Sequence, residues 1–239
     1  MRNILGLILI FGFTIATHAQ TPKHSETVQL NGLETYYEVY GEGPPLFFLH
    51  GGGQSVTVWH EYVEHFADNY EVYLVDLPGH GKSGGRVGEL SYQLQLGSDQ
   101  IQGLLDHFKL ERVNAVGFST GAGVLLTFAI SDPDRIQRMI VVGVGNQYSP
   151  KGPGGVVIRV ADEAFRSIAT ETLVVIGEND SVPGGSPSRS LQHAFRLHEL
   201  LPNSHLWVVP NEGHLTFDGS GKPDFVRIAN EFLSGEWDR

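Results

Sequence analysis

A serine between glycines occurs twice, in Gly117-Phe118-Ser119-Thr120-Gly121 and in Gly81-Lys82-Ser83-Gly84-Gly85. A serine held at a sharp turn between a strand and a helix can act as a nucleophile. Ser119 directly follows one apolar run and precedes another, whereas Ser83 lies beyond its strand in a glycine-dense stretch where no helix is expected. Ser119 is therefore the candidate nucleophile, with an ordinary helix-capping serine as the alternative interpretation.

A serine nucleophile needs a base and a group that orients the base, and two later loops supply both. Asp180 follows the strand-like run "TLVVIG", and His214 follows the run "LWVV". Serine, acid and histidine in this order, each after a strand, form one of the known chain orders of a catalytic triad. Glu178 is an alternative acid in the same loop as Asp180.

Stabilisation of negative charge on a substrate oxygen requires N–H donors close to the serine. The backbone N–H of Thr120 lies at the start of the expected helix, where N–H groups have no partner within the helix. A second donor is expected from the glycine run Gly51-Gly52-Gly53, which follows the first apolar strand and allows close approach of the backbone.

These residues need a parallel sheet to bring them together. Short β-branched runs alternate with helical patterns from Leu46 onward, which predicts an α/β fold with a mostly parallel, doubly wound sheet of about eight strands covered on both faces. The first two strands should pair as an antiparallel edge around Asn31-Gly32. The expected strands are Thr27–Gln29, Thr35–Tyr40, Leu46–Leu49, Val72–Val75, Val113–Gly117, Met139–Val144, Thr172–Ile176 and Leu206–Val209, and the expected helices are Val56–Ala67, Tyr92–Phe108, Thr120–Ile130, Pro187–Leu200 and Pro223–Leu233.

Five motifs in one order, "HGGG", "DLPGHGKS", "GFSTG", "GENDSVP" and "NEGH", resemble those of the α/β-hydrolase superfamily. The resemblance covers essentially the whole length after residue 19. It implies Ser119 as nucleophile, His214 as general base and Asp180 as its orienting acid. It also implies Gly52 and Thr120 as oxyanion donors, with Gly53 as an alternative to Gly52.

Many members of this superfamily carry a helical cap between the strands that here read "MIVVGVG" and "TLVVIG". This chain offers only residues 146–171 there, with at most one short helix near Ala161–Ile168. The cap is thus expected to be minimal or missing. Substrate-contact candidates that do not depend on a cap are Trp59, Phe118, Tyr148, Val182 and Leu215.

The N-terminus begins with Arg2, an apolar run and the small-residue end Thr17-His18-Ala19. The run is short for a membrane span, so residues 1–19 are interpreted as a signal peptide of a secreted or periplasmic protein, with a membrane anchor as the alternative. Residues 20–239 are expected to form a single domain. The net charge of −11 disfavours nucleic acid and anionic membrane surfaces as partners.

No metal or organic cofactor is needed for chemistry at a serine triad. His60 and His65 are five residues apart, whereas a metalloprotease pair on a helix is four apart. The expected function is hydrolysis of small soluble carboxylic esters through an acyl-enzyme on Ser119. Lactone hydrolysis and cofactor-free peracid formation are alternatives that would use the same triad. A ligand-binding protein with little turnover is the alternative from another class.

Overall fold

The computed structural model describes residues 21–86, 90–145, 147–148, 158–159, 161–181 and 186–238. The expected signal peptide, residues 1–19, lies outside these ranges, as does the substrate-contact candidate Val182. Tyr148 is placed in a short strand, but its side chain lies outside the description. The expectations for these residues stay predictions.

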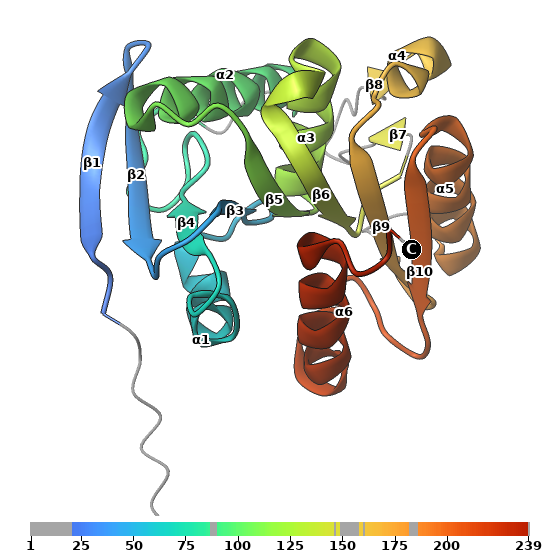
Figure 1. The fold of residues 1–239 in the computed structure, drawn as a ribbon. Helices are drawn as coiled ribbons and strands as arrows, with labels where there is room; N and C mark the ends of the chain where they lie inside the picture. The colour runs from blue at the N-terminus through green and yellow to red at the C-terminus, as the bar shows by residue number, and fades with distance from the viewer. Residues whose placement is uncertain are drawn as a thin grey trace, which may run out of the picture.

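One eight-stranded sheet organises the chain, in the order β1-β2-β4-β3-β5-β6-β9-β10 (Figure 1). β1 and β2 form an antiparallel hairpin, β2 pairs antiparallel with β4, and all remaining neighbours are parallel. The eight expected strands are all present, as β1 (His24–Leu30), β2 (Leu33–Tyr40), β3 (Pro45–Leu49), β4 (Glu71–Val75), β5 (Val113–Phe118), β6 (Ile136–Val142), β9 (Glu171–Gly177) and β10 (Ser204–Val209). The predicted mostly parallel sheet is confirmed.

Helices cover both faces of the sheet, as Figure 1 shows. α2, α3 and α5 pack on one face, and η1, α1 and α6 pack on the other. Each face therefore has its own apolar core. The helical segments are η1 (Val56–Tyr62), α1 (Val63–Phe66), α2 (Leu90–Phe108), α3 (Thr120–Ser131), η2 (Pro133–Arg135), α4 (Asp162–Arg166), α5 (Pro187–Leu200), η3 (Gly219–Gly221) and α6 (Lys222–Ser234).

The antiparallel edge forms where the sequence indicates it. Asn31 and Gly32 have φ angles of 51° and 81°. Positive φ at both central residues defines the two-residue turn whose twist matches that of a β-hairpin. Asn and Gly adopt such angles at low cost, so these two residues set the register of β1 against β2.

The segment expected as one helix over Val56–Ala67 is instead a 3₁₀ helix, η1, followed by the single turn α1. The buried residues of η1 are Val56, Trp59 and Tyr62, which are spaced by three. Side chains three apart lie above one another in a 3₁₀ helix, so this winding buries all three large groups on one side.

Strand β6 is shifted toward the N-terminus relative to expectation. β6 begins at Ile136 and ends at Val142, rather than running from Met139 to Val144. It ends there because Gly143 adopts a φ of 65°, which is incompatible with a continued strand.

The described part of the reduced cap region is small. β7 (Gln147–Tyr148) and β8 (Ile158–Arg159) form a two-stranded antiparallel ribbon, and α4 provides the one short helix that the sequence predicts. In the ranges that the structure describes, no helix combines the length and apolar character needed to cross a bilayer.

Candidate active site

Ser119 lies at the junction of β5 and α3 with a φ of 50° and a ψ of −109°. A non-glycine residue in this region is strained, and such strain is typical of functional turns. The turn is held by Ser119 N–H donating to Val142 O at 2.8 Å and by Gly121 N–H donating to His50 O at 3.1 Å. The Ser119 side chain makes no capping hydrogen bond to α3, which disfavours the interpretation of a simple helix cap.

The two glycines of the motif are required by close backbone packing. A Cβ at Gly117 would lie 2.7 Å from the backbone of Gly121 and Ala122, and a Cβ at Gly121 would lie 2.5 Å from Leu49 O. Contacts this short with backbone atoms cannot be relieved by side-chain rotation. The glycines therefore allow β5, α3 and the end of β3 to converge at the serine.

His214 and Asp180 are brought together by the loops that follow β10 and β9. Nδ1 of His214 lies 2.9 Å from Oδ2 of Asp180, and the Asp180 side chain is 1% exposed, whereas that of His214 is 27% exposed. A buried carboxylate at Nδ1 favours the tautomer that carries its proton there and leaves Nε2 able to accept one. Glu178, the rival acid, is exposed and accepts a hydrogen bond from Asn211 N–H instead.

The glycine loop after β3 lies beside the start of α3. A Cβ at Gly52 would be 3.0 Å from Thr120 Oγ1, whereas a Cβ at Gly53 would have no atom within 4 Å. Gly52 is thus the glycine of this run that adjoins Thr120, the other candidate donor.

The buried side chain of His50 holds this glycine loop through its two ring nitrogens. Its Nδ1 lies 2.7 Å from Gly51 O, and its Nε2 accepts a hydrogen bond from Leu77 N–H at 3.0 Å. Burial lowers the pKa of His50 to about 4, so the ring is neutral at pH 7 and can donate at Nδ1 while accepting at Nε2. His50 is a structural histidine of the glycine loop.

A cavity of about 490 Å³ joins the candidate residues. Ser119 and His214 line it together with Gly52, and Phe118 and Leu215, both expected as substrate contacts, line it as well. The remaining lining residues are Gln54, Glu212 and Gly213, which the sequence interpretation did not include. Asp180 lies behind His214, outside this lining.

Trp59 does not reach the cavity, contrary to its expected role as a substrate contact. Its side chain is fully buried and stacks on Phe217, with ring centroids 4.7 Å apart. The 3₁₀ winding of η1 directs Trp59 into the core on that face of the sheet rather than toward the sheet edge. Trp59 therefore belongs to the apolar core next to the site and not to the cavity lining.

The other serine-glycine motif has a structural place. Ser83 Oγ donates to Asp76 O at 2.6 Å and accepts a hydrogen bond from Tyr36 N–H. Asp76, which is buried, accepts hydrogen bonds from Val56 N–H and Lys82 N–H. The segment that carries Ser83 thus ties β2 and β4 to the start of η1.

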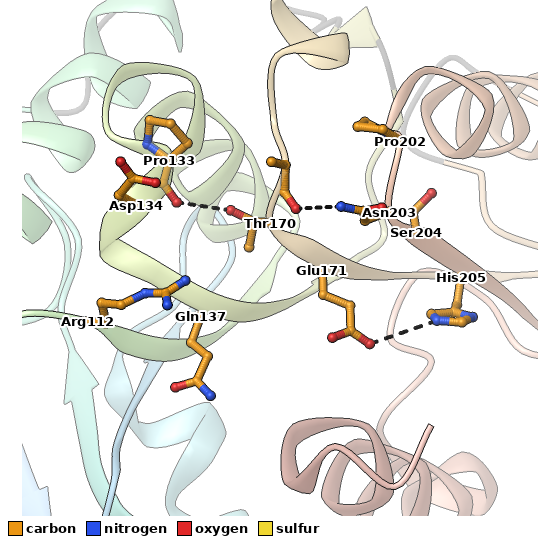
Figure 2. Close-up of a pocket in the computed structure, with 11 residues that line it drawn as sticks. Arg112, Pro133, Asp134, Gln137, Thr170, Glu171, Pro202, Asn203, Ser204 and His205 are labelled. Carbon is orange, nitrogen blue, oxygen red and sulfur yellow. Dashed lines mark hydrogen bonds and ion pairs between the residues drawn. The ribbon is translucent and has the colours of Figure 1, made fainter. Parts of the chain in front are cut away.

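A second, larger cavity of about 580 Å³ lies at the opposite edge of the sheet, where β6, β9 and β10 begin (Figure 2). Its lining includes a serine, a histidine and the carboxylates of Asp134 and Glu171, but these groups do not form a triad. Ser204 and His205 are neighbours in β10 and point to opposite sides, and His205 is 4.0 Å from Glu171. Ser204 Oγ donates to the backbone carbonyls of His198 in α5 and of Leu201, and it lies 2.9 Å from Nδ1 of His198.

Gly143 is a site residue that the sequence interpretation missed. A Cβ at Gly143 would lie 2.8 Å from Cε1 and 3.0 Å from Nδ1 of His214. The glycine at the end of "MIVVG" was a visible signal, but only the tertiary structure shows that the imidazole packs against it. Within the described ranges, no group of three or more His, Asp or Glu side chains could hold a metal ion.

Comparison with known proteins finds similarity to hydrolases in sequence and in fold. A family model described as "alpha/beta hydrolase fold" matches residues 44–154. The pimeloyl-[acyl-carrier protein] methyl ester esterase of Aeromonas hydrophila subsp. hydrophila is 38% identical over 105 residues, which are 44% of this chain and 39% of that protein. The 2-hydroxy-6-oxo-2,4-heptadienoate hydrolase of Pseudomonas putida is 25% identical over 272 residues, covering 87% of this chain and 96% of that protein.

The chain spans less than half the length of three curated relatives that are 34 to 38% identical to it. Among solved structures, a serine hydrolase from Cycloclasticus zankles superposes with a TM-score of 0.78 at 19% identity, covering 90% of this chain and 99% of that one. A carboxylesterase from Bacillus subtilis superposes with a TM-score of 0.72 at 18% identity, covering 89% and 92%. The fold expected from the five motifs is therefore confirmed.

Proposed function

The chain has the alpha/beta hydrolase fold, and from this premise we propose that it is a serine hydrolase that cleaves carboxylic esters of small soluble substrates. One observation carries the proposal. Ser119 and His214 line one cavity, while Asp180 is hydrogen-bonded to Nδ1 of His214. This arrangement supports Ser119 as nucleophile, His214 as base and Asp180 as orienting acid in acyl transfer.

In the proposed reaction, His214 Nε2 accepts the Ser119 hydroxyl proton as Oγ bonds to the ester carbonyl carbon. The N–H groups of Gly52 and Thr120 stabilise the resulting oxyanion. Collapse breaks the bond to the leaving oxygen, which takes the proton from the imidazolium and departs as an alcohol. Water, deprotonated by the same imidazole, then attacks the acyl-enzyme and releases the acid and free Ser119.

The cavity and the reduced cap region support the proposed substrate class. Phe118 and Leu215 supply the apolar lining among the described residues, and Leu215 is 41% exposed at the rim. The alignment with the heptadienoate hydrolase runs over 272 positions yet uses 87% of this 239-residue chain, so that relative has residues without a counterpart here. A shallow site of this kind suits short esters better than long acyl chains.

The test compares Ser119→Ala with Ser83→Ala, using p-nitrophenyl acetate turnover and labelling by a fluorophosphonate. Ser119→Ala should abolish both turnover and labelling. Ser83→Ala should keep turnover within a few fold, because its hydroxyl bonds to Asp76 and Tyr36 rather than lining the cavity. A folded wild-type protein that neither turns over esters nor reacts with the fluorophosphonate would contradict the proposal and favour a ligand-binding role.

A further inference from the structure

Tyr62, the last residue of η1, forms a long-range contact with the loop that carries His214. Its hydroxyl donates to the backbone carbonyl of Phe217, 155 residues away. Tyr62 and Phe217 are both about 1% exposed, so the bond is shielded from water. η1 follows the glycine loop directly, with Ser55 as its N-cap. The bond therefore joins the candidate oxyanion loop to the histidine loop.

Aromatic packing reinforces this connection. Trp59, one turn before Tyr62, stacks on the Phe217 ring at 4.7 Å with an interplanar angle of 27°. Phe118, the neighbour of Ser119, has its ring centroid 4.9 Å from both His214 and Phe217. Contacts thus run without interruption from η1 through Phe217 and Phe118 to the imidazole.

The histidine loop is also held before His214, where Asn179 N–H donates to Glu212 O and Asn211 N–H donates to Glu178 Oε2. Its backbone bonds from Asp218 N–H to Leu215 O and from Gly221 N–H to Asp218 O are internal to the loop and η3. Asp180 holds the imidazole ring itself. Tyr62 holds the chain at Phe217, three residues after His214, whereas β10 holds the chain before His214.

We propose that the Tyr62 hydroxyl is a positioning group that sets the distance of His214 from Ser119 and the oxyanion loop. This inference rests on the proposed function of the triad. Loss of the hydroxyl would leave the buried Phe217 carbonyl without a partner, and the loop would move to find one. Displacements of about 1 Å at a catalytic group can lower a rate by about 10²-fold.

The experiment compares Tyr62→Phe with Tyr73→Phe. Tyr73 is also buried, and its hydroxyl also donates one hydrogen bond, to Glu71 Oε2, but it lies on β4 and packs against Phe47 and Phe108 away from the cavity. Both variants keep the aromatic ring. In Tyr62→Phe the ring is further retained by Lys222, whose Nζ lies 4.8 Å from the ring centroid.

Tyr62→Phe should lower kcat for p-nitrophenyl acetate by about 10- to 100-fold with KM within threefold, whereas Tyr73→Phe should leave kcat within twofold. Both variants should remain folded at the assay temperature, which their thermal unfolding midpoints will measure. A Tyr62→Phe enzyme with kcat within twofold of wild type, or an equal loss of kcat in both variants, would overturn the proposal.

A second measurement does not depend on turnover. The downfield proton resonance of His214 Nδ1–H, assigned by its absence from His214→Gln, reports the bond to Asp180. It should shift or broaden in Tyr62→Phe and remain unchanged in Tyr73→Phe. If the wild-type protein proves inactive, the proposed function fails, and an unchanged resonance in Tyr62→Phe would overturn the positioning role separately.

Discussion

Replacing Gly143 by alanine tests whether the imidazole of His214 requires the space that this glycine leaves. Two costs are expected. Gly143 has a φ of 65°, where an L-residue with a Cβ costs about 1 to 2 kcal/mol of stability. The added Cβ would also lie 2.8 Å from His214 Cε1, whereas carbon atoms in contact prefer about 3.5 to 4.0 Å. The ring would therefore have to move by about 0.7 to 1.2 Å.

Gly32→Ala separates these two costs. Gly32 has a φ of 81°, and a Cβ there would have no atom within 4 Å, so its substitution carries the backbone strain without a collision. Both variants should unfold at a lower temperature than wild type. Only Gly143→Ala should lose activity, with kcat for p-nitrophenyl acetate lower by about 10- to 100-fold. If kcat of Gly143→Ala equals that of Gly32→Ala, the packing of His214 against Gly143 does not matter for the reaction.

Three further outcomes are expected. Asp180→Asn should lower kcat by about 10³- to 10⁴-fold because an amide does not favour the required histidine tautomer, and Glu178→Gln should change it little; the reverse result would make Glu178 the acid. Burial lowers the pKa of His50 from 6.5 to about 4. The unfolded chain therefore binds a proton between these pH values that the folded chain does not, and up to about 3 kcal/mol of stability should be lost as pH falls through this window. Urea unfolding at pH 7 and at pH 4.5 measures this loss, which His50→Gln should reduce; equal pH dependence in both proteins would contradict it. Finally, kcat/KM for p-nitrophenyl esters should vary little with acyl length, and a steep rise toward long chains would show an enclosed channel.

Local sequence patterns determined the sheet and much of the site. Continuous β-branched runs can be buried on both faces only inside a parallel sheet, and that sheet places every strand-following loop at one edge. Ser119, Asp180 and His214 each follow such a strand, so their meeting could be predicted from order alone. The glycines at 117 and 121 marked the turn because only their lack of a Cβ permits the approach of β5 to α3.

Features that depend on which surfaces meet could not be read from the chain. Trp59 was expected to contact the substrate, but the 3₁₀ winding of η1 buries it against Phe217. Whether this segment forms a 3₁₀ helix or an α-helix depends on the aromatic side chains that it packs against in the folded protein. Gly143 and Tyr62 carry no motif, because their roles come from contacts with residues 71 and 155 positions away. Local propensity acts over a few residues, whereas the fit of the imidazole between two loops is decided only when the packed tertiary structure brings those loops together.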